Sequence, residues 1–460
     1  MLEIKIPKSF SKELSWLFRV ILDDFFNIPY EIETVDDDKN VYIETTSKSI
    51  KIPNIFLFQA KKNWLDEISL PKKVSFLALE KYFNKQFHKP DLPVFFGKPN
   101  IEFSENEVFL KFDLIGTLFF FLSGYEGASF KRKDEHERFK LEDSILFQHN
   151  LIFRALVDEY CEVLWHLLEI NNKNLKRKPT EVNLEISCDV DVPFTLSSRS
   201  FFLTLKTIVG DILKRNNVFI ALKNFLNYFF TKINFFYFDP LNTFNLIMDV
   251  NEIYGNKVIF NFILNQNSFM DGEFSLKDTQ VKVLLNNIIK RGHKIGLHAS
   301  YNSFKDFSLF SKEVEMLKEL FKKKGISNYK IHNRQHYLRW CDKKTPHILN
   351  ASGVDFDSSV YFASSPGFRA GTSKEFRMFD LEKRESLNLI QKPLLIMEES
   401  MLSDKYLGLK SKKEIFKMID GLVSTIRYHG GNITLLWHNS SLQTRFNKKI
   451  YKEILKRISD

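Results

Sequence analysis

From residue 182 onward, short apolar segments alternate with longer amphipathic ones, and this rhythm constrains the fold more than any other feature. The short segments have the length of buried strands, and the segments between them have the periodicity of helices. Repeated alternation of strand and helix is typical of a parallel sheet, open or closed into a barrel. We expect strands at 182–186, 257–263, 294–297, 329–331, 393–396 and 433–437, and helices at 278–291, 311–324 and 412–428.

A polar and basic stretch, 171–180, separates this region from the first part of the chain. It follows an apolar helical pattern at 151–170. Earlier alternating runs at 41–44 and 108–112 indicate strands of a modest sheet. We therefore expect an α+β domain of unknown role at 1–175 and a (β/α) barrel at 181–460.

The composition is that of a folded chain, 44% hydrophobic and 27% charged. The net charge of +10 comes from scattered basic residues, which favours a solvated surface over nucleic-acid binding. The longest apolar run, 114–122, is about half the length that crosses a bilayer, so we expect no transmembrane segment and leave a peripheral membrane contact open. The three cysteines lack CxxC spacing and the start lacks an apolar signal core, which together predict a cytoplasmic protein.

Two carboxylates, Asp189 and Asp191, stand two residues apart at the end of the first expected strand. On one face of a strand they would repel each other, so we expect a cation between them or a raised pKa of one. This suits a site in which one carboxylate binds metal and the other takes a proton from water. On its own, the pattern is more often a solvated turn.

Histidines follow two further expected strands. His298 ends the strand at 294–297, where a neutral imidazole is a common metal ligand. His293 precedes that strand and is interpreted as structural. His438 follows an apolar strand, where an imidazole can act as a general acid. Taken singly, each of these histidines is more often a hydrogen-bonded structural residue.

Two turns in this region carry arginine. The turn 333–340 contains Arg334, His336 and Tyr337, and so combines anion-binding groups with flat faces that can stack on sugars. A later loop presents Arg369, which can orient a carboxylate or an oxyanion. The sequence has no glycine-rich phosphate-binding motif.

In their order along the chain, these motifs resemble those of the polysaccharide deacetylases, carbohydrate esterase family four. The resemblance rests on Asp189-Val-Asp191, Gly-Leu-His298, an arginine-bearing turn and Leu-Leu-Trp-His438. It implies a distorted (β/α) barrel of the polysaccharide deacetylase type, preceded by a smaller α+β domain.

A bacterial subgroup of this family, without signal peptide and associated with surface-polysaccharide gene clusters, is the most similar. It shares turns like Arg334-Gln-His-Tyr-Leu338 and Gly367-Phe-Arg-Ala-Gly371. Its members also carry an N-terminal domain with stretches like 119–126 and 137–139.

The resemblance also implies roles for individual residues. Asp189 would be the general base, and Asp191 and His298 would bind a divalent metal, most often zinc in this family. His438 would be the general acid, and Arg334 or Arg369 would hold the base or the substrate. The candidate substrate-binding aromatics are Tyr301, Tyr337 and Trp437.

One position departs from the family pattern. The second motif usually has another histidine four residues after the first, and here that residue is Asn302. Asn can coordinate through its carbonyl oxygen but is a poor zinc ligand. Three alternatives stay open: His336 replaces the missing ligand, the metal is weakly held or harder than zinc, or the site keeps only sugar binding.

The resemblance therefore implies a metal-dependent hydrolase that removes an N-acyl group, first of all acetyl, from a sugar or glycan intermediate in bacterial surface polysaccharide biosynthesis. The alternative is a non-catalytic glycan-binding protein on a degenerate barrel. In both cases the partner is an acylated sugar or glycan, and nucleic acid is not expected.

Overall fold

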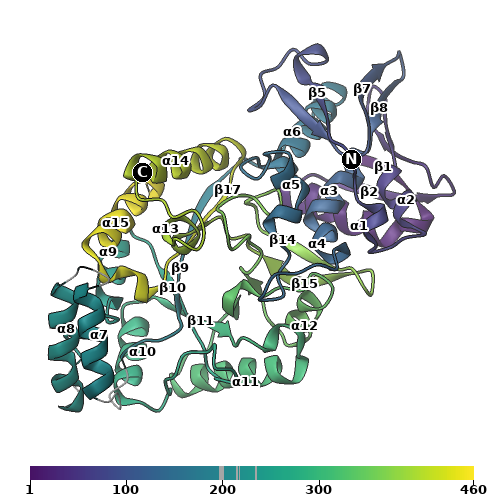
Figure 1. The fold of residues 1–460 in the computed structure, drawn as a ribbon. Helices are drawn as coiled ribbons and strands as arrows, with labels where there is room; N and C mark the ends of the chain where they lie inside the picture. The colour runs from purple at the N-terminus through teal and green to yellow at the C-terminus, as the bar shows by residue number, and fades with distance from the viewer. Residues whose placement is uncertain (196–200, 214–215, 217, 234–235, 460) are drawn as a thin grey trace.

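The computed structural model describes residues 1–195, 201–213, 216, 218–233 and 236–459 (Figure 1). Their two main sheets differ in kind: the first part of the chain forms a smaller mixed sheet, and the second part forms a curled and almost entirely parallel one. The predicted alternation of strands and helices is thus present in the second part, as a curled sheet with two edges.

The curled sheet has nine strands in the order β14-β15-β13-β12-β11-β10-β9-β17-β16. Every neighbouring pair is parallel except β14 and β15, which form an antiparallel hairpin. The bounds are β9 (Val182–Val190), β10 (Val258–Phe262), β11 (Lys294–Ala299), β12 (His332–Gln335), β13 (Phe356–Asp357), β14 (Phe376–Asp380), β15 (Glu385–Gln391), β16 (Ile396–Met397) and β17 (Gly431–Leu436).

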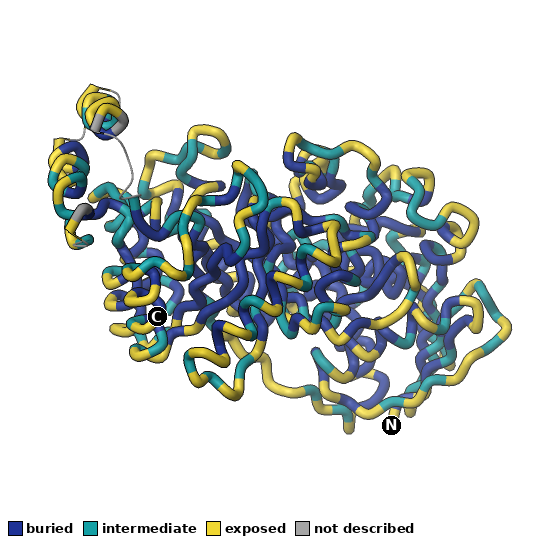
Figure 2. The backbone as a smooth tube through the Cα atoms, turned by 90° about the horizontal axis from the view of Figure 1, so that it is seen from below, coloured by how far each residue is buried: buried dark blue, intermediate teal, exposed yellow. Residues whose placement is uncertain are grey.

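Helices surround the outside of the curl (Figure 1). They are α9 (Phe244–Ile253), α10 (Thr279–Lys290), α11 (Phe307–Lys323), α12 (Thr345–Ala351), α14 (Lys412–His429) and α15 (Arg445–Ser459). A further pair, α7 (Phe201–Leu213) and α8 (Val218–Phe230), stands out from the periphery (Figures 1 and 2). The short helix α13 (Glu398–Leu402) follows β16.

Helix α11 shows how the sequence sets these elements. Its apolar residues recur at helical spacing, and Phe310, Val314 and Leu317 are buried. Asp306 caps the first turn by accepting a hydrogen bond from the Leu309 N–H. Gly325, with a φ of +68°, follows its last turn and allows the chain to reverse.

Parallel pairing brings the carboxyl ends of the strands to one edge of the curl. We call the edge formed by the ends of β9, β11, β12 and β17 the mouth. In the register, Asn261 of β10 lies beside Asp189 of β9, and His298 of β11 lies beside Arg334 of β12. The predicted motif residues are thus neighbours in space although they are far apart in sequence.

The first part of the chain has a six-stranded sheet in the order β2-β1-β3-β4-β8-β7 and a separate pair, β5 with β6. Helix α3 (Leu114–Leu122), the longest apolar run, is buried along its whole length. The strands are β1 (Leu2–Pro7), β2 (Tyr30–Val35), β3 (Asn40–Glu44), β4 (Ser49–Pro53), β5 (Ser75–Ala78), β6 (Asp91–Val94), β7 (Gly97–Phe103) and β8 (Glu107–Phe112). The other α-helices are α1 (Ser11–Phe18), α2 (Ile55–Ala60), α4 (Tyr125–Ser129), α5 (Ile145–Gln148) and α6 (Leu156–Asn171).

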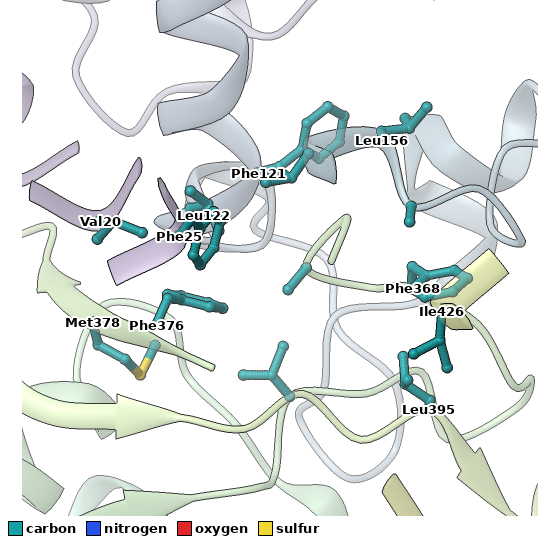
Figure 3. Close-up of a cluster of buried hydrophobic side chains, with 14 of the residues drawn as sticks. Val20, Phe25, Phe121, Leu122, Leu156, Phe368, Phe376, Met378, Leu395 and Ile426 are labelled. Carbon is teal, nitrogen blue, oxygen red and sulfur yellow. The ribbon is translucent and has the colours of Figure 1, made fainter. Parts of the chain in front are cut away.

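The two parts share one apolar core. The indole N–H groups of Trp16 and Trp64 donate to the carbonyl oxygens of Arg377 and Leu381, at 3.0 and 2.8 Å. Because buried side chains of both parts meet in one cluster, the division into 1–175 and 181–460 remains a prediction. Figure 3 shows the contact, with Val20, Phe25, Phe121, Leu122 and Leu156 on one side and Phe368, Phe376, Met378, Leu395 and Ile426 on the other.

A bilayer-crossing helix would need a long and strongly apolar sequence. Across the described part of the chain, no helix meets both conditions.

Candidate metal and catalytic site at the mouth

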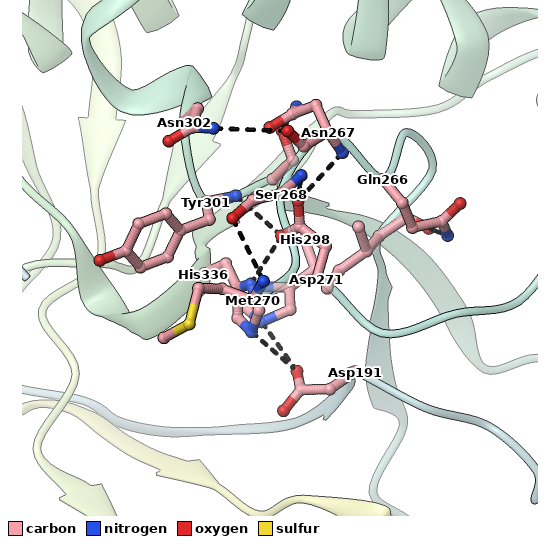
Figure 4. Close-up of polar contacts among 12 residues, drawn as sticks. Asp191, Gln266, Asn267, Ser268, Met270, Asp271, His298, Tyr301, Asn302 and His336 are labelled. Atoms are coloured by element: carbon pink, nitrogen blue, oxygen red, sulfur yellow. Dashed lines mark hydrogen bonds and ion pairs between the residues drawn. The ribbon is translucent and has the colours of Figure 1, made fainter.

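Three potential metal ligands converge at the mouth (Figure 4). One ligand atom from each of Asp191, His298 and His336 can be chosen so that all lie within 4.8 Å of one another. The Asp191 Oδ1 atom is 3.2 Å from His298 Nε2 and 3.7 Å from His336 Nε2. His298 ends β11, His336 follows β12 and Asp191 follows β9, so three strand ends build the cluster.

The other nitrogen of each imidazole is held in place. His298 Nδ1 donates to the carbonyl oxygen of Arg334 at 2.9 Å, and His336 Nδ1 donates to Asp271 Oδ1 at 2.9 Å. Such partners fix the tautomer, so that each Nε2 presents its lone pair toward Asp191. The two rings are thus oriented as metal ligands.

Asp271 is fixed by backbone donors in turn. The N–H of Tyr301 donates to its Oδ1 at 2.9 Å, and the N–H groups of Asn267 and Ser268 donate to its Oδ2 at 3.2 and 3.1 Å. Burial alone would raise the pKa of Asp271, but the bonds from His336 and from these amides outweigh it and lower the pKa. The carboxylate therefore stays charged beside His336.

The cluster fits a divalent cation. Asp191 Oδ1 is buried and, among the described residues, has no hydrogen-bond partner, although the Asp191 side chain as a whole is 36% exposed. Burial would raise the pKa of Asp191, but the neighbouring imidazole of His298 and the charges of His336 and His438 lower it. One carboxylate and two oriented imidazoles are a common zinc ligand set with open positions left.

Asp189 lies behind this cluster, two residues before Asp191 in the chain. It is 2% exposed, and its Oδ1 accepts a hydrogen bond from Asn261 Nδ2 at 2.7 Å. Its Oδ2 is 3.9 Å from His298 Nε2. One oxygen of Asp189 is therefore anchored, and the other faces the ligand cluster.

His438, at the end of β17, is held by a carboxylate that the sequence did not reveal. Its Nδ1 donates to Glu398 Oε1 at 2.7 Å, and its backbone N–H donates to the same oxygen at 2.9 Å. Burial would lower the pKa of His438, but the charge and hydrogen bond of Glu398 raise it well above the usual value, and Asp191 and Asp189 add to this. His438 is thus kept protonated, as a general acid requires.

The two predicted arginines lie in different places. Arg334 points into the buried interior, where its Nη2 donates to Ser187 Oγ at 3.1 Å and its Nε to Ser358 Oγ at 3.0 Å. Its Nη1 is buried without a hydrogen-bond partner among the described residues. Arg369 instead pairs with Asp342 at 3.2 Å and donates to the Tyr361 carbonyl oxygen at 3.1 Å.

Arg369 also lies at the contact between the two parts of the chain. It lies in a small cavity together with Glu126 and Phe139 from the first part. Its guanidinium is satisfied by Asp342, so the predicted role in holding the base or substrate is corrected to a structural one.

Two of the three predicted substrate-binding aromatics reach the rim of the mouth. The Tyr301 ring packs against His336 with centroids 6.5 Å apart, and Tyr337 packs against His336 at 4.7 Å. Trp437 is different, because it is fully buried and packs on Tyr451 at 5.0 Å. The prediction that Trp437 binds substrate is wrong in this structure: alternation along the chain turns it into the core while His438 turns to the mouth.

Asn302 is also placed apart from the cluster. Its side chain is exposed, and its Nδ2 donates to the Asn267 carbonyl oxygen at 3.5 Å. Figure 4 shows it turned away from Asp191, while His336 occupies the third position. The prediction of Asn302 as a ligand is therefore corrected, and the alternative in which His336 supplies the ligand fits the geometry.

A loop from the first part of the chain completes the rim. His136 Nδ1 and the Tyr301 hydroxyl are 3.0 Å apart, and Arg138 Nη1 donates to the Tyr337 carbonyl oxygen at 2.9 Å. Tyr337 has a φ of +58°, a strained conformation for a residue with a side chain, and such strain is frequent at functional sites. The sequence hinted at this loop only through the resemblance at 137–139.

A second group of potential ligands lies at the amino end of β15. His347 Nδ1 is 3.0 Å from Asp380 Oδ2, and Glu385 is the third member. Glu385 is exposed, and Asp380 already accepts the N–H groups of Glu382 and Lys383. The cluster at the mouth is better built, because both of its imidazoles are buried and oriented by a second partner.

Comparisons with known proteins give a partial picture. Residues 2–173 match a family of unknown function (DUF7033). No curated protein sequence matches the chain. A crystal structure described as a "putative polysaccharide deacetylase" from Mycobacterium smegmatis aligns over 61% of this chain and 85% of its own, with a TM-score of 0.39 and 13% identity. Likeness at this level carries no argument about function, which therefore depends on the geometry of the site.

Proposed function

We propose that this chain is a metal-dependent hydrolase that removes an N-acyl group, first of all acetyl, from a sugar or glycan. The observation that carries the proposal is the convergence of Asp191, His298 and His336 at the mouth, with Asp189 and a protonated His438 beside them. A metal-binding group of side chains, next to one carboxylate and one imidazolium, is the arrangement that amide hydrolysis requires.

In this proposal Asp191, His298 and His336 would hold a divalent ion, with zinc as the first candidate. When bound, such an ion polarises the acyl carbonyl and lowers the pKa of water. Asn261 occupies Oδ1 of Asp189, so Oδ2 is the atom that accepts a proton from the attacking water.

His438 supplies a proton on the other side of the reaction. Because its Nδ1–H donates to Glu398, its Nε2–H is the group that can protonate the leaving amine. The rings of Tyr301 and Tyr337 offer flat faces on which a sugar can stack, and the His136 loop limits how far the sugar extends.

The setting of the reaction belongs to the same proposal. An acylated glycan intermediate of bacterial surface polysaccharide biosynthesis is the substrate class, and the cytoplasm, where such intermediates are assembled, is the compartment. Nucleic acid is not the expected partner, because the basic residues of the chain are scattered and form no compact block.

Acetate release tests the proposal. Purified protein with added zinc is incubated with N-acetylated nucleotide sugars and lipid-linked glycans, and acetate is measured. We expect release, abolished in Asp189→Asn and unchanged in the matched surface variant Asp404→Asn, which replaces an 85% exposed carboxylate. No acetate from any acylated sugar, together with no metal by elemental analysis, would refute the proposal.

The alternative of a non-catalytic glycan-binding protein was motivated by Asn302. It predicts sugar binding that survives both Asp189→Asn and His438→Ala, with no acetate from the unaltered protein. Calorimetry with an N-acetylated sugar and the acetate assay on the same variants separate the two functions.

A further inference from the structure

The helical pair α7–α8 presents large apolar side chains to solvent. Phe202, Leu213 and Phe219 are 76%, 77% and 68% exposed. Figure 2 shows the pair set apart from the body of the molecule, with much of its surface exposed. Further exposed apolar residues of the pair are Leu205, Val209, Ile212, Val218, Leu222, Phe225 and Phe229.

Polar side chains of the same pair lie inside. Asp211 and Asn227 are buried, and Asn224 Nδ2 donates to Asp211 Oδ2 at 2.6 Å across the two helices. Thr204 of α7 is buried as well. A helical pair in water buries its apolar side chains. Among the described side chains of this pair, Ile220 and Ala221 are buried beside these polar residues, but most of the large apolar side chains face outward. Where the outside of a helical pair contacts apolar material instead of water, apolar side chains are stable on its outer surface.

The charge of the segment narrows the choice of partner. Between residues 201 and 238 the sequence has one acidic residue, Asp211, which is buried. The exposed lysines Lys206 and Lys223 lie among the apolar residues. The basic residues of this segment are Lys206, Lys214, Arg215, Lys223 and Lys232. A basic, apolar-faced helical element is typical of proteins that lie in the interface of an anionic bilayer.

The base of the pair is joined to the catalytic site. The pair follows β9, whose end carries Asp189 and Asp191. The carboxylate of Asp239 accepts a hydrogen bond from the N–H of Thr195 at 2.7 Å, and this bond joins the two ends of the segment that contains the pair. Asn439, next to His438, donates from Nδ2 to the Val192 carbonyl oxygen at 3.1 Å. Whatever the pair binds is therefore held near the mouth.

We propose that α7–α8 docks the protein on an anionic membrane surface, with its apolar face in the headgroup layer, and that the site acts on glycan carried by a lipid in that membrane. The second clause rests on the proposed function, whereas the docking does not. A second copy of the chain is a weaker occupant, because two such pairs would bring basic segments together and repel.

Vesicle binding tests the docking. The unaltered protein is sedimented with vesicles of phosphatidylglycerol and, separately, of phosphatidylcholine. We expect binding to phosphatidylglycerol that weakens with salt, and a loss of about tenfold or more in the combined variant Phe202→Ser, Leu213→Ser and Phe219→Ser. A matched control, Ile68→Ser, Ile253→Ser and Val283→Ser, removes apolar residues that are 68%, 75% and 62% exposed elsewhere and keeps the binding.

Equal binding by the unaltered protein and the α7–α8 variant would overturn the proposal, as would no binding to phosphatidylglycerol. Light scattering provides a further check: self-association that the α7–α8 variant abolishes, without any vesicle binding, would overturn it in favour of a second copy.

Hydrolysis separates this inference from the proposed function. We expect the α7–α8 variant to release acetate from a soluble N-acetylated sugar as well as the unaltered protein does, but to lose release from an acetylated lipid-linked glycan in vesicles. Equal loss on both substrates would overturn the lipid-linked substrate. Vesicle binding without hydrolysis by any of the proteins would support the docking and refute the hydrolase.

Discussion

Histidines at the two edges of the curled sheet lie in opposite electrostatic surroundings. At the mouth, the pKa values of His298 and His438 are raised, because buried carboxylates outweigh the effect of burial. At the amino edge, where the strands begin, burial lowers the pKa of His332 to about 4 and that of His429 to about 3, and Lys392 and Lys374 respectively add to this. The carboxylates at the mouth thus favour the protonated form of an imidazole, whereas burial at the amino edge favours the neutral form.

Depth of burial does not explain the difference, since His298 and His429 are both 2% exposed. The partners explain it. His298 has Asp189 and Asp191 nearby, whereas both ring nitrogens of His429 are without a hydrogen-bond partner among the described residues. A strand-end histidine is therefore a candidate catalytic or metal-binding residue when buried carboxylates face it. Its position along the strand alone does not make it one.

The largest expected effect comes from removing the protonated imidazole at the mouth. His438→Asn should lower acetate release by about 10²–10⁴-fold, because the leaving amine loses its proton donor. His429→Asn at the amino edge should leave the rate unchanged. Steady-state rates of both variants, with circular dichroism to check folding, measure the difference. Equal losses would contradict the contrast between the edges.

A smaller effect is expected from the carboxylate that orients a ligand. Asp271→Asn should weaken metal binding by about 10–100-fold, because a neutral amide holds the Nδ1–H of His336 less strongly than the carboxylate does. Competition with a chelator measures the affinity. Asp278→Asn, which alters a carboxylate on the same connection between β10 and α10, is the control and should keep the affinity. Unchanged affinity in Asp271→Asn would remove His336 from the ligand set.

Sequence alone predicted the parallel part of the fold well, because buried strands and amphipathic helices have different periods. Helix α10 (Thr279–Lys290) and helix α14 (Lys412–His429) lie close to the predicted ranges. The strand predicted at 329–331 lies instead at His332–Gln335, and the strand predicted at 393–396 is only Ile396–Met397. Short strands depend on their neighbours, so their bounds are weakly set by local sequence.

The hairpin β14–β15 was not predicted, for a local reason. Its turn, 381–384, has none of the Gly, Asn or Pro residues that mark turns. Arg384 adopts a φ of +53° there, while its guanidinium lies 4.7 Å from the Trp64 ring centroid and pairs with Glu13. Contacts with the first part of the chain thus stabilise a turn that its own residues do not favour.

The sequence singled out candidate residues at strand ends, and the structure brings three of them, Asp191, His298 and His336, together. Asp271 and Glu398 were missed because each acts through a histidine that is distant in sequence, His336 or His438. No spacing rule connects such partners before the fold is known. Orienting carboxylates are found from the structure, whereas ligand-type residues at strand ends can be found from the sequence.

At the amino edge, the burial of His429 leads us to expect a pH-dependent stability. Its folded pKa of about 3 lies below the ordinary value of about 6.5, so below that pH the unfolded chain takes up a proton that the folded chain does not. Stability is therefore lost as the pH falls from 6.5 toward 3. His429→Phe should remove about 2 kcal/mol of this loss at pH 5, since the phenyl ring needs no proton.

Denaturant unfolding at pH 7 and pH 5 measures this difference for His429→Phe. The control is His149→Phe, which replaces a partly exposed histidine and should keep the pH dependence of the unaltered protein. If His429→Phe and the unaltered protein lost the same free energy of unfolding between pH 7 and pH 5, His429 would be protonated in the folded chain. The contrast between the two edges would then fail.

The smallest effect is expected at Asn302, a residue at the mouth without an inward-facing side chain. Asn302→Ala should change metal affinity by less than about twofold, because among the described residues its amide bonds only to the Asn267 carbonyl oxygen, and His336 supplies the third ligand. The same chelator competition measures it, and His336→Ala is the paired variant that should lose most of the affinity. If Asn302→Ala lost as much, the side chain would turn inward when metal binds, and sequence spacing would then have identified the ligand better than the geometry of the unliganded mouth.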